Sequence, residues 1–199
     1  MVALPALTSV DNFFRSQGRK SVQQDRSELV ELAANIRQRA GLGEPPFSTR
    51  IMIDECFPDV YVTGERLPRG VAESVSMGKR GPIIAYNRLL TTAQQRLSIA
   101  HAIGHLVFDR DDLRGHCKAT PSDERESRAE FFGAELLVPL TMFSDYVRRW
   151  RYPRETAMRP AHLNMVDQLA SHFHVPQSLI HRRLAALGRY RKHRAIEET

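Results

Sequence analysis

The sequence lacks most of the features that mark secreted, membrane-spanning and phosphate-binding proteins. Its 199 residues include only two cysteines, Cys56 and Cys117, which are too few for a disulfide framework and are compatible with a reducing compartment. No apolar run approaches the roughly eighteen residues of a membrane span, and the first residues lack the basic start and long apolar stretch of a signal peptide. Glycine-rich phosphate loops, low-complexity tracts and internal repeats are also missing. We therefore expect a soluble, cytoplasmic protein.

The overall composition is that of a globular chain with a basic surface. Hydrophobic residues make up 42% of the chain, enough to bury one ordinary core. The formal net charge is +6. An excess of basic residues is compatible with affinity for nucleic acid or for an acidic partner, but charge alone does not choose between them.

The most informative segment carries two histidines four residues apart. Residues 92–108 are predicted to form a largely buried helix, because apolar residues surround the histidines on both sides. His101 and His105 then lie on one face of the helix, where both imidazoles can reach a single metal ion. The pair alone does not establish a metal site, because buried histidines are also common as hydrogen-bonded core residues.

A hydrolytic zinc site needs a third protein ligand and leaves one position open to water. The best source is residues 123–139, a predicted helix in which Glu126 lies three residues before Ala129 on the apolar side. A carboxylate on a packed face is costly unless it is paired or binds a metal, so Glu126 is the leading candidate. Glu130, one turn later, is the reserve, and Glu135 is expected on a solvated face.

These two segments strongly resemble the motifs of the ImmA/IrrE family of zinc metallopeptidases. The family has His-Glu-x-Gly-His, then Glu-x-x-Ala, then a Phe-Ala-Ala-x-Leu-Leu-x-Pro tail. This chain has His-Ala-Ile-Gly-His at 101–105, Glu-x-x-Ala at 126–129 and Phe-Gly-Ala-x-Leu-Leu-x-Pro at 132–139. The segment 81–87 resembles the family strand that leads into the active-site helix. The resemblance extends over about residues 48–140, with a weaker match at 164–188, and two linked motifs are far more specific than one.

The resemblance implies a zincin-like α+β fold, with helices and a small antiparallel sheet, followed by a helical pair like a helix-turn-helix. We expect an amino-terminal extension at 1–24, a metallopeptidase core at 25–140 and a helical region with a basic tail at 141–199. The implied zinc (Zn²⁺) ligands are His101, His105 and Glu126. The implied activity is endopeptidase cleavage of a helix-turn-helix transcriptional repressor, which switches on stress, mobile-element or phage-defence genes.

Ala102 departs from the family pattern, because it stands where the family has its catalytic glutamate. That glutamate takes a proton from the attacking water and later delivers it to the leaving amine. General acid–base assistance is worth about 10²- to 10⁴-fold in rate, and an alanine methyl group supplies none. We therefore expect this form to be inactive. Two origins are consistent with Ala102, namely removal of the base by an experimenter and natural evolution of a pseudoenzyme. The alternative function is a zinc-binding pseudoenzyme that binds DNA or the repressor without cleavage.

The polar loop at 113–121 joins the two helices that carry the candidate ligands. Cys117 in this loop is a candidate fourth zinc ligand, because a thiolate there would exclude water and hold the enzyme latent. The alternative is an ordinary loop cysteine. His116 competes for the same role, and it is also a candidate for stabilising the oxyanion of the transition state.

Three short strands are predicted before the helix at 92–108, at residues 60–63, 71–77 and 83–86. In peptidases of this general design, an edge strand beside the metal holds the substrate by strand addition. The segment 83–87 is the candidate, and a plain structural strand is the alternative. Its residues are Ile83, Ile84, Ala85, Tyr86 and Asn87.

The carboxy-terminal segment 165–188 has apolar spacing that resembles a helix-turn-helix. Helical pairs of this pattern also occur where the two helices only pack against the rest of the protein, so contact with DNA is one of two interpretations. The candidate nucleic-acid residues are Arg182, Arg183, Arg191 and Lys192.

Overall fold

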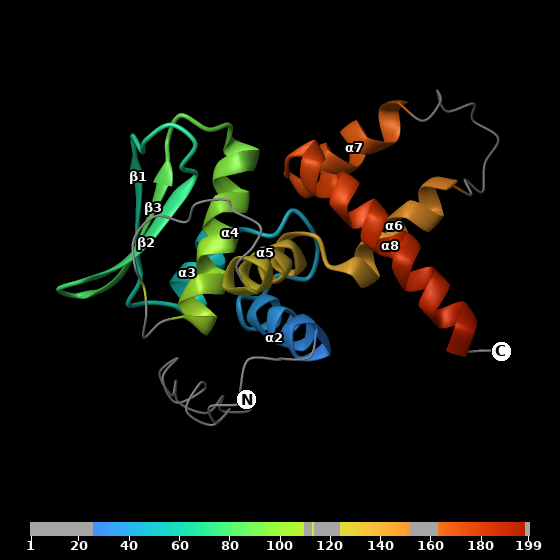
Figure 1. Ribbon diagram of the computed structural model, residues 1–199, viewed down its shortest axis with the longest axis horizontal. Helices are drawn as coiled ribbons and strands as arrows, with labels where there is room; N and C mark the ends of the chain where they lie inside the picture. Colours follow the sequence, from blue (N-terminus) through green and yellow to red (C-terminus); the bar gives the residue numbers. More distant parts are fainter. Residues whose placement is uncertain (1–25, 110–112, 114–123, 152–162, 198–199) are drawn as a thin grey trace.

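A computed structural model describes residues 26–109, 113, 124–151 and 163–197, and within them the side chains of 150, 151, 163, 164 and 189–197 are not described. In this part of the chain there are seven helices and three strands (Figure 1). The helices and strands are α2 (Arg26–Arg39), α3 (Thr49–Cys56), β1 (Tyr61–Glu65), β2 (Glu73–Gly78), β3 (Gly81–Asn87), α4 (Thr92–Phe108), α5 (Glu124–Leu137), α6 (Leu140–Arg151), α7 (Leu163–Phe173) and α8 (Gln177–Glu197). The predicted α+β class is confirmed. The predicted extension at 1–24 lies outside the described residues.

The three strands form one sheet in the order β1-β3-β2. β2 and β3 form an antiparallel hairpin that closes at the pair Gly78 and Gly81. β1 pairs with the other side of β3 in parallel, with Tyr61 opposite Ile83. The predicted antiparallel sheet is therefore confirmed for the pairing of β2 with β3 and wrong for the pairing of β1 with β3. Residues 66–72 carry the chain past the end of β3, so β2 runs opposite to β1, and the hairpin then turns β3 back into the direction of β1.

Helix α4 begins directly after the central strand and coincides with the predicted helix. Thr91 caps it: the Thr91 hydroxyl accepts from the Gln94 backbone N–H, and the Gln94 side chain accepts from the Thr91 backbone N–H. This reciprocal arrangement satisfies backbone donors that a helix start otherwise leaves unpaired. α4 packs against β2 and β3 on one side and against α5 on another. The cap fixes the residue at which α4 begins, and with it the position of the two histidines between the sheet and α5.

Helices α4 and α5 approach so closely that each has a glycine at the contact. A Cβ atom added at Gly104 of α4 would lie 2.7 Å from the Ala129 Cα of α5. A Cβ added at Gly133 of α5 would lie 2.9 Å from the Ala100 carbonyl carbon and from the His101 backbone nitrogen. These neighbours are backbone atoms, which cannot rotate away as a flexible side chain can. The two glycines thus permit the close crossing that brings α5 beside the histidines.

Replacing Gly133 by alanine is therefore expected to lower the free energy of unfolding by about 1–3 kcal/mol, the usual range for overpacking. Gly188→Ala is the matched control. Gly188 also lies in a helix, but an added Cβ there meets no atom within 4 Å, so the higher helix propensity of alanine leaves stability unchanged or slightly raised. Urea unfolding of both variants measures the difference. Equal midpoints for Gly133→Ala and the parent would contradict the close crossing.

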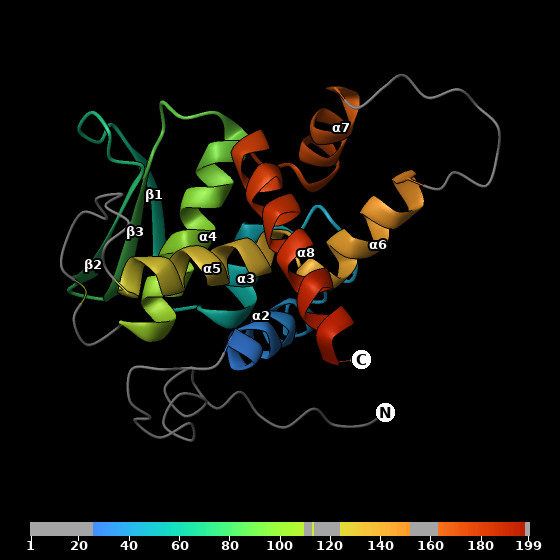
Figure 2. The same ribbon diagram turned by 45° about the vertical axis from the view of Figure 1, so that its right-hand side comes forward.

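Two hydrophobic clusters lie on opposite sides of the α4–α5 pair. The first includes Leu29 of α2, Met52 of α3, Ile84 of β3 and Ile103 of α4. The second joins α4 and α5 to α6, α7 and α8, with Phe173 fully buried. In both views of the ribbon, α4 lies between the sheet and the carboxy-terminal helices (Figures 1 and 2). The carboxy-terminal helices therefore pack against the core through an apolar contact.

Glu135 of α5 is buried, with 1% of its surface exposed, so the prediction that it lies on a solvated face is wrong. Its carboxylate forms an ion pair with Arg183 of α8 at 2.8 Å, and it accepts from the Leu140 backbone N–H at 3.3 Å. Its backbone carbonyl accepts from Arg37 of α2. The three charged residues join α2, α5 and α8, and the cost of burying Glu135 is offset by these partners.

None of the helices in the described part of the chain is both long enough and apolar enough to cross a membrane.

Candidate metal centre

His101, His105 and Glu126 lie together where α4 and α5 cross. The two imidazole Nε2 atoms are 2.9 Å apart. The carboxylate of Glu126 is 3.1 Å from His101 Nε2 through one oxygen and 3.4 Å from His105 Nε2 through the other. One donor atom from each of the three residues lies within 4.8 Å of the others. In the described part of the chain, this is the one group of three such residues that is arranged to hold a metal ion.

The chemistry and spacing of these atoms fit a zinc ion. Zinc binds histidine nitrogen and carboxylate oxygen at about 2.0–2.2 Å, so two ligand atoms in a tetrahedral site lie about 3.3–3.6 Å apart. The separations of 2.9, 3.1 and 3.4 Å need adjustments of about half an ångström or less to reach that range. Three protein ligands also leave one position for water or substrate, as in hydrolytic sites.

The site is closed on the core side and open on the other. His105 is buried, whereas the His101 and Glu126 side chains keep 18% and 20% of their surface exposed. The hydrogen bond from His101 lowers the pKa of Glu126, and the charge of His105 adds to this effect, although partial burial acts in the opposite direction. Glu126 is thus held as a carboxylate, the form that binds metal.

A second carboxylate holds the ring of His105 from behind. The Oδ2 atom of Asp109 lies 2.9 Å from His105 Nδ1, the nitrogen that faces away from His101. The other oxygen of Asp109 accepts from Arg128 of α5 at 2.8 Å, and the Arg128 guanidinium lies over the ring of Phe108. A carboxylate on Nδ1 leaves Nε2 unprotonated and available to a metal. Asp109 was not among the residues predicted from the sequence, although its position four residues after His105 is a signal.

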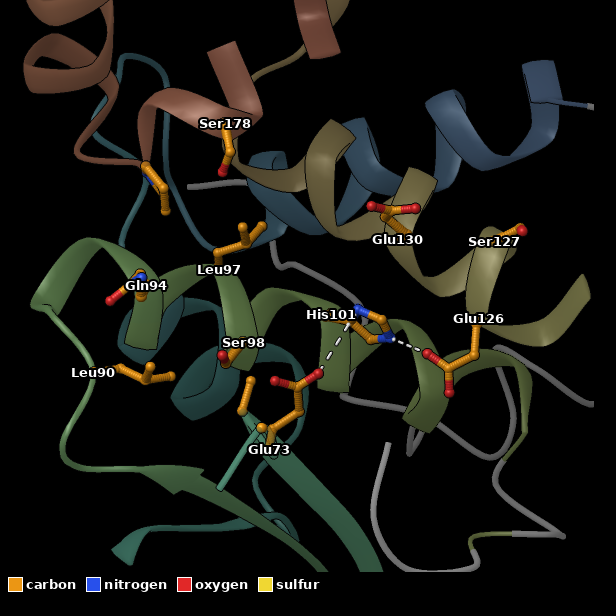
Figure 3. A pocket seen from close by; sticks show the side chains of 13 residues that line it. Glu73, Leu90, Gln94, Leu97, Ser98, His101, Glu126, Ser127, Glu130 and Ser178 are labelled. Carbon is orange, nitrogen blue, oxygen red and sulfur yellow. Dashed lines mark ion pairs between the residues drawn. The ribbon is translucent and has the colours of Figure 1, made fainter. Parts of the chain in front are cut away.

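Glu73, the first residue of β2, brings another carboxylate to the site. It is only 5% exposed, and its Oε1 lies 3.8 Å from His101 Nδ1 (Figure 3). Burial raises the pKa of Glu73, while nearby His101 and a hydrogen bond with Ser98 act to lower it. Sequence analysis did not identify Glu73 either. The available signal was a charged residue at an inward position of a strand whose next inward residue is Val75.

Ala102, which takes the place of the family glutamate, is completely buried. It belongs to the same cluster as Val75 of β2 and Ile84 of β3. Ala100 and Gly104 of α4 contact α5, and position 102 lies about 200° around the helix from each of them. Position 102 therefore faces away from α5, and α4 also packs against β2 and β3.

A cleft of about 340 Å³ opens over His101 and Glu126 (Figure 3). Its walls come from β2, from α4, from α5 and from the start of α8, where Pro176 and Ser178 contribute. Leu90 and Leu97 add apolar surface. The carboxy-terminal helical region thus forms part of the wall of the cleft.

Two of the predicted site assignments are wrong. Segment 83–87 lies in β3, which is hydrogen-bonded on both sides, so it has no free edge to which a substrate strand can add. Arg183 is 3% exposed and paired with Glu135, so it is not available to nucleic acid, whereas Arg182 keeps 45% of its side chain exposed although it pairs with Glu130. Both errors have the same cause, because neighbours distant in the sequence cover groups that local patterns leave exposed.

Other predicted site residues cannot be compared with the structure. His116 and Cys117 lie outside the described residues. Arg191 and Lys192 lie within α8, but their side chains are outside the described part.

The chain is similar to known proteins over most of its length. The family model Peptidase M78, the IrrE N-terminal-like domain, matches residues 57–185, which include all three clustered side chains. A solved Mycobacterium tuberculosis transcriptional regulator is similar to this chain with a TM-score of 0.54 and 17% identity. The match covers 88% of this chain and 50% of that protein, so this chain spans half of its length. At this identity the likeness concerns the fold alone. No curated protein matches the chain.

Proposed function

Because the chain belongs to Peptidase M78, the metallopeptidase family of the IrrE N-terminal-like domain, we propose that it is a zinc-dependent endopeptidase. The observation that carries this proposal is the convergence of His101, His105 and Glu126, of which His101 and Glu126 line an open cleft. These three residues would hold the zinc ion. When bound there, zinc supplies Lewis acidity, which polarises the scissile carbonyl and makes water more acidic.

The remaining residues of the site prepare the ligands and receive the substrate. Asp109 orients His105, and Arg128 in turn holds Asp109. The edge strand β2 lies beside the cleft and pairs only with β3 within the described sheet. Its outer side therefore offers backbone groups to an extended peptide by strand addition. β2 takes over the role that the sequence assigned to segment 83–87.

The substrate that we propose is a helix-turn-helix transcriptional repressor in the cytoplasm. Its cleavage would switch on stress, mobile-element or phage-defence genes. Resemblance to the ImmA/IrrE family supports this proposal, and an open cleft beside an edge strand suits an extended segment of a protein substrate. A repressor encoded beside this chain is the first candidate to test.

With Ala102 in place of the motif glutamate, α4 supplies no carboxylate to accept the proton of the attacking water. If no other residue supplied one, the protein would bind zinc and substrate without cleaving the substrate. This observation favours the second candidate function, a zinc-binding pseudoenzyme that binds the repressor or DNA. The expected inactivity applies only if no other carboxylate reaches the attacking water. Direct DNA contact would rest on Arg182, Arg191 and Lys192, because Arg183 is buried in its ion pair with Glu135.

The test of the proposed function is incubation of zinc-loaded protein with the candidate repressor. Ala102→Glu restores the family motif and is expected to cut the repressor at one site, which gel electrophoresis and mass spectrometry locate. Adding His105→Ala to that variant is the control, and it should abolish the cut because a zinc ligand is lost. Stable repressor binding by Ala102→Glu without any cleavage would favour the pseudoenzyme instead.

A further inference from the structure

Position 102 and strand β2 face each other across the same small space. Side chains on a helix lean toward its amino terminus, so a glutamate at 102 would place its carboxylate over the preceding turn, which contains Ser98. Ala102 is buried in one cluster with Val75 of β2, and α4 packs directly on that strand. The missing carboxylate would therefore lie between Ser98 and β2, next to His101.

Glu73 brings a carboxylate to this space from the opposite wall. Glu73 and Val75 are two residues apart on β2, so their side chains leave the same face of the strand, and both are buried. The Glu73 carboxylate is hydrogen-bonded with Ser98 and lies 3.8 Å from His101 Nδ1. It lines the cleft together with His101 and Glu126, and Figure 3 shows it directed toward His101.

The other carboxylates that line the cleft have different partners. Glu126 contacts both histidine Nε2 atoms, and Glu130 pairs with Arg182 of α8. Glu73 forms no ion pair with an arginine or lysine among the described residues, and its 3.8 Å distance from His101 is too long for a hydrogen bond. A glutamate that is 5% exposed and has only a histidine at 3.8 Å as its charged neighbour is costly to fold, which calls for a functional reason.

We propose that Glu73 replaces the missing motif glutamate as the proton acceptor for the attacking water. The carboxylate has in effect moved from the helix to the edge strand. This inference rests on the proposed peptidase function, and it departs from the inactivity expected from Ala102 alone.

The proposed reaction is hydrolysis without any change of oxidation state. The water oxygen forms a bond to the scissile carbonyl carbon, and the proton of that water passes to the Glu73 carboxylate. Glu73 then gives this proton to the amide nitrogen as the carbon–nitrogen bond breaks. The products are a carboxylic acid, which carries the second proton of the water, and an amine, and Glu73 returns to its ionised form. Ser98 holds Glu73 in place through its hydrogen bond and takes no part in the transfer.

The test compares four zinc-loaded proteins: the parent, Glu73→Gln, Ala102→Glu and the double variant. Glutamine keeps the size of the side chain and a hydrogen bond to Ser98 but accepts no proton. We expect the parent to cut the repressor, and we expect Glu73→Gln to lower kcat by about 10²- to 10⁴-fold with KM and zinc content unchanged. The double variant should regain cleavage, because the base returns to α4. Glu65→Gln, at an exposed glutamate of strand β1, is the matched control and should leave cleavage unchanged.

A second measurement does not depend on the repressor or on turnover. A peptide hydroxamate binds zinc most tightly when a neighbouring carboxylate accepts its proton. Calorimetry should therefore show at least about tenfold weaker hydroxamate binding by Glu73→Gln than by the parent, and recovery in the double variant.

The outcomes separate this inference from the proposed function. Cleavage by Ala102→Glu but not by the parent would overturn the role of Glu73 and leave the peptidase function standing. Loss of zinc from Glu73→Gln would also overturn it, because Glu73 would then act by orienting His101. If no variant cuts the repressor, the proposed function fails, and the hydroxamate affinities alone decide whether Glu73 accepts a proton in this cleft.

Discussion

His105→Ala is expected to lower zinc affinity by about 10²- to 10⁴-fold. A structural zinc site contributes about 10–16 kcal/mol of binding free energy. If three ligands share it about equally, the loss of one removes about 3–5 kcal/mol, and each 1.4 kcal/mol is a factor of ten. His105 is also the most buried of the three clustered residues, so water replaces it less easily than it would replace Glu126. Competition with a chromophoric chelator measures the affinity.

Asp109→Asn tests whether the hydrogen bond between Asp109 and His105 supports zinc binding. It keeps the shape of the side chain but weakens the hydrogen bond to His105 Nδ1, so we expect a smaller loss of zinc affinity, about 10- to 100-fold. Asp54→Asn is the control, since Asp54 pairs with Arg50 on the exposed side of α3. Zinc content that stays unchanged in His105→Ala would rule out the proposed ligand set.

Glu135→Ala is expected to lower the free energy of unfolding by about 3–5 kcal/mol, because it leaves a buried charge without its partner. Arg183 is 3% exposed and depends on Glu135 for its ion pair. Nearby Arg37 is also affected, since burial lowers its pKa to about 10 and the Glu135 charge opposes that shift. Chemical unfolding measures the loss.

Two further variants show whether the buried position causes this effect. Glu130→Ala removes the partner of Arg182 in an ion pair that is about half exposed, so it should cost only about 0–1 kcal/mol. Replacing the buried pair by apolar residues, Glu135→Leu with Arg183→Met, should recover most of the stability, because both charges leave the interior together. A loss below about 1 kcal/mol for Glu135→Ala would mean that water reaches Arg183.

Local periodicity was enough to predict the ligand-bearing helices. The predicted bounds of α4 match the structure, because the Thr91 cap and the apolar neighbours of the histidines are features of one continuous segment. The same reasoning placed Glu126 on the packed side of α5, and the structure brings it to the histidines. Spacing along one helix is nearly invariant, so a pattern of four residues carries over directly into three dimensions.

The errors concern groups whose surroundings come from distant parts of the chain. The apolar residues of β3 predicted a strand but not which strands lie beside it. Because β3 is paired on both sides, it cannot be the strand to which a substrate adds. Glu135 lies away from the main apolar stripe of α5. Only the packing of α2 and α8 against this side of α5 shows that it is buried. A pattern in one segment reports which face is apolar, and it does not report what covers the other faces.

The sequence by itself therefore determined the candidate metal ligands, because His101 and His105 share one helix turn and Glu126 lies on the apolar stripe of the next helix. The loss of the motif glutamate at Ala102 was equally a property of the sequence. Only the tertiary structure decided what surrounds these residues. It brought Glu73 from β2 to His101 across 28 residues of sequence and closed the cleft with the start of α8. Such contacts depend on how the sheet, α4 and α5 pack, which is a long-range property that no local spacing contains.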